Sequence, residues 1–151
     1  LIKSILAQVN GKTERELNYE ITGTLSVVSG LKISYISQET SHLRGTLKAY
    51  AEKNDIDYTL LLTLLRQLDF SRVQFGKDMI EFSEGQKKKV LIASSLLTPA
   101  HIYIWDEPLN YIDVFSRMQI EKLLMHYAPT MLLVEHDVKF KETLSTKLVK
   151  M

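Results

Sequence analysis

Two adjacent carboxylates, Asp106 and Glu107, are the residues of this sequence best placed to do chemistry. They follow His101–Trp105, whose near-continuous apolar character is typical of a strand buried in a parallel sheet. Carboxylates at the end of such a strand can hold Mg²⁺ and polarise a water molecule beside a nucleotide phosphate. Because burying both carboxylates without a metal or a partner would cost several kcal/mol, chemistry is favoured over an ordinary surface pair.

A second candidate site precedes the carboxylates at residues 82–86, which read Phe-Ser-Glu-Gly-Gln. Ser83 is a good N-cap for the predicted helix Lys87–Leu97, and Gln86 completes a capping-box pattern. A helix N-terminus offers free N–H groups and a positive dipole end to an anion such as phosphate. The plain alternative is a helix start without a ligand. Pro99 marks the end of this helix.

Two more polar residues follow predicted strands: Gln38 after Leu31–Ser37, and His136 after Thr130–Val134. Taken alone, Gln38 is explained as an ordinary loop residue, and a single histidine is more often structural than catalytic. The remaining histidines show no metal-ligand spacing: His42, His101 and His126.

In order and spacing, these segments resemble the motifs of ATP-binding-cassette (ABC) ATPases. Residues 83–86 are similar to the signature motif, residues 104–108 to the Walker B strand with its catalytic glutamate, and residues 134–137 to the switch-histidine segment. The amino-acid sequence of residues 82–89 and 105–113 resembles the second cassette of ABC-F proteins of the ribosomal-protection, antibiotic-resistance kind. The resemblance covers nearly the whole chain.

The resemblance implies a role for each residue at the strand ends. Asp106 would hold Mg²⁺ through a water, and Gln38 would contact both Mg²⁺ and the attacking water. Glu107 would act as the general base for that water. His136 would sense the γ-phosphate of ATP and hold the water and Glu107 in place.

The same resemblance implies contacts with a second cassette. Ser83, Gly85 and Gln86 would close over a nucleotide bound to the opposite cassette, and Asp113 would couple the two cassettes across their interface. Glu84 stands where cassette ATPases more commonly have glycine. Tyr111 and Ile112 replace the more usual His-Leu pair, which we interpret as a subgroup marker.

The predicted fold is α/β, a P-loop NTPase-like ABC domain with a mostly parallel core sheet, flanking helices and an inserted helical subdomain. Residues 1–151 are predicted to be one partial nucleotide-binding domain. Residues 1–40 and 98–151 would form the core-sheet part, and residues 41–97 the helical subdomain with the signature motif. Further helices are predicted over Leu1–Gln8, Phe115–His126 and Val138–Leu144. Ser41–Phe70 is predicted to hold two amphipathic helical stretches, the second at Tyr58–Leu68. A strand Gly23–Val28 in a hairpin with Leu31–Ser37 and a final strand from Lys147 are also predicted.

The first residues, Leu1–Leu6, begin in mid-pattern and resemble the helix that directly follows a phosphate-binding loop. The chain is therefore predicted to be an N-terminally truncated fragment of a longer protein, with the Walker A loop before residue 1. Gly11-Lys12-Thr13 lacks the earlier glycine and the preceding strand of a P-loop, so a polar turn is predicted there. Asp55 or Asp57 is expected to cap a helix within the subdomain.

Composition is ordinary for a soluble globular protein, with 151 residues, 45% apolar and 25% charged residues. The net charge of +1 gives no global attraction to nucleic acid or membrane. Cysteine is absent, and no apolar run is long enough to span a bilayer, so a cytoplasmic location without membrane insertion is predicted. The run Lys87–Lys89 is expected to be solvated surface, with phosphate of nucleotide or ribosomal RNA as the alternative partner.

The expected function is ATP binding and hydrolysis, with ATP and Mg²⁺ as cofactors, by an ABC-F type ATPase acting on the ribosome in translation or antibiotic resistance. The second cassette would lie in the same polypeptide or in a dimer partner, and the fragment alone would be inactive. Two alternatives remain. One is the ATP-binding subunit of an ABC membrane transporter, and the other is an inactive fragment without turnover.

Overall fold

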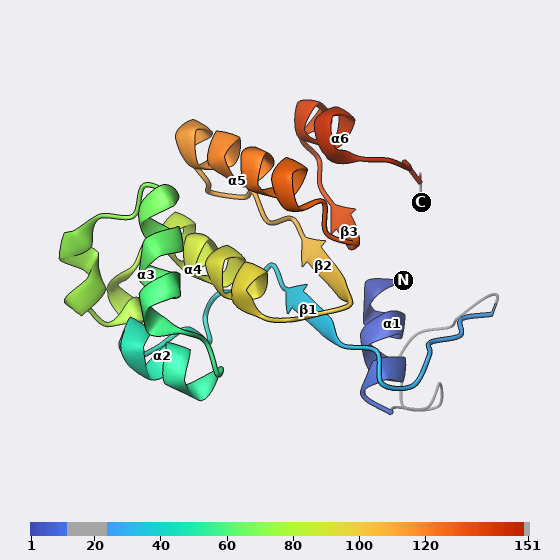
Figure 1. Ribbon diagram of the computed structural model, residues 1–151, viewed down its shortest axis with the longest axis horizontal. Coiled ribbons are helices and arrows are strands. Elements are labelled where there is room, and N and C mark those ends of the chain that lie inside the picture. The colour runs from blue at the N-terminus through green and yellow to red at the C-terminus, as the bar shows by residue number, and fades with distance from the viewer. Residues whose placement is uncertain (12–23, 150–151) are drawn as a thin grey trace.

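The computed structural model describes residues 1–11 and 24–149 and shows an α/β fold built on a parallel sheet. The sheet has the order β1-β2-β3, with β1 at Ile33–Ile36, β2 at Ile102–Asp106 and β3 at Met131–Val134. Helices flank this sheet (Figure 1). The predicted fold class is therefore confirmed.

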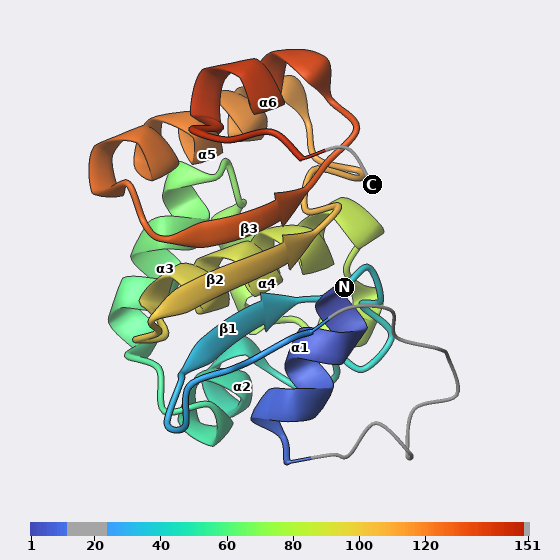
Figure 2. The same ribbon diagram turned by 90° about the vertical axis from the view of Figure 1, so that its right-hand side faces the viewer.

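The three strands end at one edge of the sheet, where Figure 2 shows their arrowheads side by side. Ile36 of β1 lies opposite Trp105 of β2, and Asp106 of β2 lies opposite Val134 of β3. Because the strands are parallel and in step, the segments that follow them start next to one another. This edge brings together the polar residues that the sequence places after each strand.

Helix α4, Glu84–Leu97, packs against β1 and runs back along the sheet towards the start of β2 (Figure 2). A chain of buried polar groups fixes it there. Trp105 Nε1 donates to Ser95 Oγ at 2.9 Å, and the Ser95 and Ser34 hydroxyls lie 2.7 Å apart. Since buried hydrogen bonds are costly to leave unmade, this chain sets the register of the helix on the sheet.

The helical part that precedes α4 contains two helices, in agreement with the two stretches predicted within Ser41–Phe70. Helix α2 spans Leu47–Lys53 and α3 spans Tyr58–Gln67. Residues 41–46 are not helical, so the first stretch starts later than predicted. Residues 54–57 separate the two helices, because Asp55 has a positive φ of 54° and Asp57 starts a new helix. The Asp57 side chain caps α3 by accepting from Leu60 N–H at 2.9 Å, as one of the two predicted caps.

Two 3₁₀ turns, Arg72–Gly76 and Met79–Glu81, lead from α3 to α4. The core is continuous from the sheet into this helical part, since one buried apolar cluster contains Trp105, Ile92 and Leu65. The helical part is thus packed against α4, which in turn packs against β1.

The other predicted helices are confirmed with small changes of their bounds: α1 at Ile2–Val9, α5 at Val114–Tyr127 and α6 at Val138–Leu144. Helix α1 lies on the face of the sheet opposite α4, and α5 packs against α6 (Figures 1 and 2). Among the residues described, no helix combines the length and apolar character that crossing a membrane requires.

Two predicted strands are wrong over the residues that the structure describes. Residues 24–28 form no strand, although the turn at Ser29-Gly30 is present, with Gly30 at φ 79°. The Leu25 carbonyl instead accepts a hydrogen bond of 2.9 Å from the Gln8 side chain of α1. Residues 147–149 also form no strand. Lys12 and Thr13 of the predicted polar turn lie outside the described residues.

Candidate functional site

Asp106 and Glu107 lie at the carboxyl edge of the sheet, where the ladder between β2 and β3 ends. Glu107 N–H donates to the Val134 carbonyl at 2.9 Å, one residue beyond the end of β2. Glu107 then adopts a left-handed conformation with φ 49°. For a residue other than glycine this conformation costs roughly 1–2 kcal/mol. Such strain clusters at functional sites, where the surrounding structure holds it in place.

Gln38 and Asp106 lie close together because the neighbouring strands β1 and β2 end at the same edge of the sheet. The Gln38 side-chain amide donates to Asp106 Oδ1 at 3.3 Å. Carboxylate and amide oxygens are hard ligands of the kind that suits Mg²⁺. Within residues 1–11 and 24–149, no group of three or more His, Cys, Asp or Glu could hold a metal. Mg²⁺ usually keeps several waters and substrate phosphates beside one or two protein ligands, so this pair fits it.

The Glu107 carboxylate is held from both sides. Its Oε1 lies 3.1 Å from His136 Nε2, and its Oε2 accepts from the Asn110 side-chain amide at 2.7 Å. The His136 side chain is 83% exposed, so a ligand at this edge can reach it. The structure therefore joins the predicted base to the predicted switch histidine.

Asn110 is a site residue that sequence reasoning missed. It lies within the run 105–113 that carries the family resemblance, yet nothing in the residue type shows where its amide points. The positive φ of Glu107 turns the chain, and Asn110 then faces the carboxylate three residues before it. Only the folded turn reveals this contact.

The start of α4 forms the predicted capping box. Ser83 N–H donates to Gln86 Oε1 at 2.9 Å, and Gln86 N–H donates to Ser83 Oγ at 3.3 Å. The Gln86 side chain is therefore occupied by the cap in this structure. Gly85 has a structural role as well, since a Cβ atom there would lie 2.3 Å from the Tyr111 carbonyl oxygen.

Glu84, at the position more commonly taken by glycine, forms side-chain contacts within the same chain. Its carboxylate accepts a short hydrogen bond from the buried Thr40 hydroxyl and pairs with Lys87 at 3.0 Å. The Thr40 hydrogen bond first, and then Lys87, lower the pKa of Glu84. This arrangement ties the signature segment to the loop that follows Gln38.

The expectation that Lys87–Lys89 is solvated surface is wrong for two of its three residues. Lys88 is only 1% exposed and Lys89 only 7%. Lys88 Nζ donates to the Ser37 carbonyl at 2.9 Å, directly before Gln38. The run is buried because α4 lies against the end of β1, which the sequence pattern does not show.

Burial lowers the pKa of the Lys88 ammonium, against the opposing effect of nearby carboxylates, with Asp106 the largest and Glu107 the next. Lys88 thus places a positive charge close to the candidate magnesium and base residues. A cation in this position compensates part of their negative charge.

Asp113 lies at the start of α5 and joins this helix to α4. It caps α5 by accepting from Ser116 N–H at 2.8 Å, and it pairs with Lys89 at 2.7 Å. Burial alone would raise the pKa of Asp113, but hydrogen bonds from Lys89 and Ser116 outweigh it and hold the pKa far below its ordinary value. Asp113 is therefore charged and held in place beside the signature helix.

Comparison with known proteins shows the family to which this sequence is related. A family model described as ABC transporter matches residues 1–110. The ribosome protection protein VmlR of Bacillus subtilis is 32% identical over 133 residues, which cover 84% of this chain and 24% of VmlR. The chain spans about a quarter of the length of the first curated relatives it matches. The predicted resemblance to ABC-F ribosomal-protection proteins is confirmed.

Solved structures share the fold. A structure of the RNase-L Inhibitor gives a TM-score of 0.67 at 24% identity and covers 95% of this chain and 28% of that one. The structure of a complex of archaeal ribosomal stalk protein aP1 and archaeal ribosome recycling factor aABCE1 gives a TM-score of 0.65 at 27% identity. That match covers 83% of this chain and 26% of the other.

Proposed function

The chain belongs to the ABC transporter family, and from this premise we propose that it forms part of an ATP-hydrolysing site in a longer protein, called the parent below. In the parent, a phosphate-binding loop outside this chain completes the site. Residues 1–40 and 98–151 form the core part of the nucleotide-binding domain, and residues 41–97 form its helical subdomain. The relatives, which are about four times as long as the matched segment, support this proposal.

The observation that carries the proposal is the Glu107 carboxylate held between His136 and Asn110, beside the Gln38–Asp106 pair. Glu107 accepts the proton of the attacking water. His136, exposed and in contact with Glu107, holds the water and the γ-phosphate in line. Asp106 and Gln38 hold Mg²⁺, which when bound supplies positive charge to the phosphate oxygens. Positioning and electrostatics do most of the work, because phosphoryl transfer needs little covalent chemistry from the protein.

A second cassette completes the closed state. The N–H groups at the start of α4, with Ser83 and Gly85, face a nucleotide bound to that cassette, while Gln86 maintains the helix start. Asp113, charged and held by Lys89, carries the coupling between the cassettes. The positive end of the α4 dipole supports this assignment.

The test of hydrolysis is Glu107→Gln in the parent. Removing a general base lowers turnover by about 100-fold or more, while ATP binding stays unchanged. The matched control is Glu142→Gln, an exposed glutamate on α6. ATP binding is measured by calorimetry and turnover by phosphate release. Wild-type turnover in the Glu107 variant would remove this residue from its role.

The parent acts on the ribosome in the cytoplasm, in translation or antibiotic resistance. Similarity to the ribosome protection protein VmlR and to the archaeal ribosome recycling factor aABCE1 supports this assignment. The test is co-sedimentation of the Glu107→Gln parent with ribosomes, with and without ATP. Pelleting that depends on ATP supports the ribosome. ATP binding without pelleting favours the ATP-binding subunit of a membrane transporter, and a wild-type parent without binding or turnover favours an inactive protein.

A further inference from the structure

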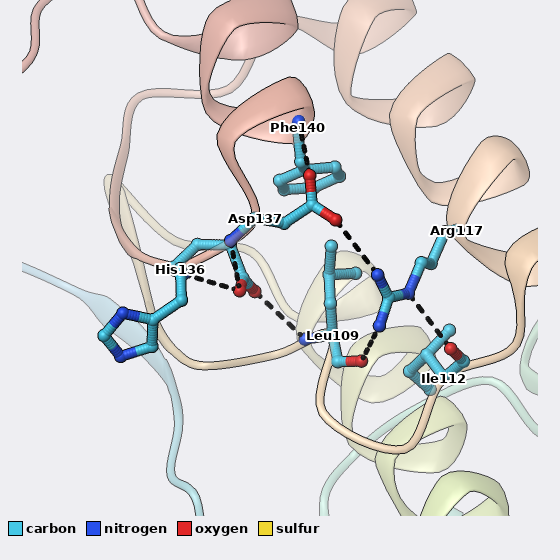
Figure 3. A network of polar contacts seen from close by, with 7 residues as sticks. Leu109, Ile112, Arg117, His136, Asp137 and Phe140 are labelled. Atoms are coloured by element: carbon cyan, nitrogen blue, oxygen red, sulfur yellow. Dashed lines mark hydrogen bonds and ion pairs between the residues drawn. The ribbon is translucent and has the colours of Figure 1, made fainter.

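Arg117 joins the two segments that carry the base and the switch histidine. This residue lies one turn into α5 and is partly buried. Its guanidinium donates to the Ile112 carbonyl at 3.0 Å through Nε, and to the Leu109 carbonyl at 3.2 Å through Nη2. Its Nη1 pairs with Asp137 at 3.0 Å. Figure 3 shows the guanidinium between these three partners.

The partners of Arg117 belong to the two parts of the site. Leu109 and Ile112 lie in the loop that follows Glu107, and Asp137 directly follows His136. Asp137 is itself fixed, because its Oδ1 accepts from Phe140 N–H at 2.9 Å and caps α6. Arg117 therefore connects the loop of the base to the start of α6.

A second side chain closes this connection into a ring. Glu135 accepts from Leu109 N–H at 3.3 Å and from His136 N–H at 2.7 Å. Leu109 is thus held by its N–H and by its carbonyl, through Glu135 and Arg117. In Figure 3 the His136 imidazole points away from this ring, so the ring fixes the backbone of His136 while its side chain contacts Glu107.

The loop needs such support because two of its residues are strained. Glu107 has φ 49° and Tyr111 has φ 66°, both in the left-handed region. Strained residues persist only where surrounding contacts fix them. An arginine suits this task because its planar fork can bond two carbonyls and a carboxylate at once, which a lysine ammonium cannot do in the same geometry.

We propose that Arg117 is a positioning residue of the hydrolytic site. By linking the loop of residues 107–112 to Asp137, it keeps the Glu107 carboxylate in contact with His136. The inference rests on the proposed ATP hydrolysis. Arg117 touches no reacting atom, so its loss lowers turnover through misplacement of Glu107 and leaves nucleotide affinity largely intact.

The experiment compares kcat and KM for ATP in the parent and in its Arg117→Gln, Arg117→Lys and Asp137→Asn variants. A displacement of about 1 Å at a reacting group can cost 100-fold, so we expect Arg117→Gln to lower kcat at least about tenfold. KM stays within about twofold, because ground-state binding is unchanged. Arg117→Lys does not restore kcat. Lys122→Gln, at an exposed site on the same helix, is the matched control.

Asp137→Asn removes the ion pair with Arg117 but keeps the cap of α6. Asparagine still caps α6 but lacks the charge for Arg117, so we expect kcat to fall about threefold. The Asp137→Asn, Arg117→Gln double variant should match Arg117→Gln within about twofold, since both changes break one connection. The single Asp137→Asn variant also tests the proposal if Arg117→Gln does not fold.

Full kcat in Arg117→Gln or Arg117→Lys, additive losses in the double variant, or a loss expressed only in KM would each overturn the proposal. A wild-type parent that does not hydrolyse ATP would instead refute the proposed function. A wild-type parent that turns over ATP as fast as its folded Arg117→Gln variant refutes only the role of Arg117.

Discussion

The two sides of the site hold their polar residues in different ways. On the signature side, made of residues 37–40 and 83–89, Lys88 is 1% exposed and Lys89 is 7% exposed. On the switch side, made of residues 107–112 and 135–137, the His136 side chain is 83% exposed. The two lysines of the signature side are therefore part of the packed interior, while the His136 imidazole of the switch side is open to a ligand.

This difference determines what a substitution on each side should change. A buried polar group left without a partner costs about 1–3 kcal/mol, while an exposed pair contributes about 0–1 kcal/mol. Every buried side-chain nitrogen and oxygen in the described part of the chain has a hydrogen-bond partner. Changes at the buried groups of the signature side should thus lower the free energy of unfolding, and changes at the exposed His136 of the switch side should lower turnover.

The largest loss of stability is expected for Gly85→Ala. A Cβ at Gly85 would lie 2.3 Å from the Tyr111 carbonyl oxygen, and a backbone atom cannot move aside as a flexible side chain can. We expect a loss of about 3 kcal/mol, at the upper end for overpacking. Urea unfolding of the chain measures it. Gly76→Ala is the control, because a Cβ there meets nothing within 4 Å. Equal stability of the two variants would contradict the close packing of α4 on residue 111.

Lys88→Met should cost about 2 kcal/mol, since the Ser37 carbonyl loses its donor and the nearby carboxylates lose a cation. Lys87→Met is the matched control in the same helical turn. It removes only a pair with the more exposed Glu84, which contributes at most about 1 kcal/mol. Urea unfolding again provides the values. A Lys88 variant as stable as the wild type would show that the buried ammonium contributes nothing net, and the contrast between the two sides would weaken.

Asp113→Asn should cost about 1 kcal/mol at neutral pH, because asparagine keeps the cap of α5 but loses the charge facing Lys89. The folded pKa of Asp113 lies below its unfolded value. Its contribution is therefore complete above about pH 3.9 and is lost as the pH falls towards the folded pKa. Unfolding curves of the two proteins should converge in acid. A constant difference from neutral to acid pH would show that the charge of Asp113 is not the cause.

Much of the fold could be predicted because its signals are local. The capping box of Ser83 and Gln86 and the apolar runs of β2 and β3 are each contained in a few neighbouring residues. Parallel strands end at a common edge, so the contacts of Gln38 with Asp106 and of Glu107 with His136 also follow from the order of the motifs.

The errors arise where structure depends on distant parts of the chain. Residues 41–46 have helical composition, yet Leu43 is buried in the common core and the segment forms a loop. Lys88 belongs to a charged run, but its burial depends on where the end of β1 lies. Asn110 and Arg117 gain their roles from a strained turn at Glu107, and no spacing in the sequence predicts that turn.

The smallest effect on stability, and the sharpest test of the contrast, is expected for His136→Ala. The side chain is largely exposed and its contact with Glu107 is its one hydrogen bond within the described residues. We expect a change in the free energy of unfolding below about 0.5 kcal/mol. In the parent, loss of this preorganised contact should lower turnover by about 100-fold.

His42→Ala, also exposed, is the control for both measurements. A loss above about 1 kcal/mol in urea unfolding would place His136 among the groups that hold the fold, because an exposed pair contributes less than that. The switch side would then be built as the signature side is, and the separation of folding from turnover would fail.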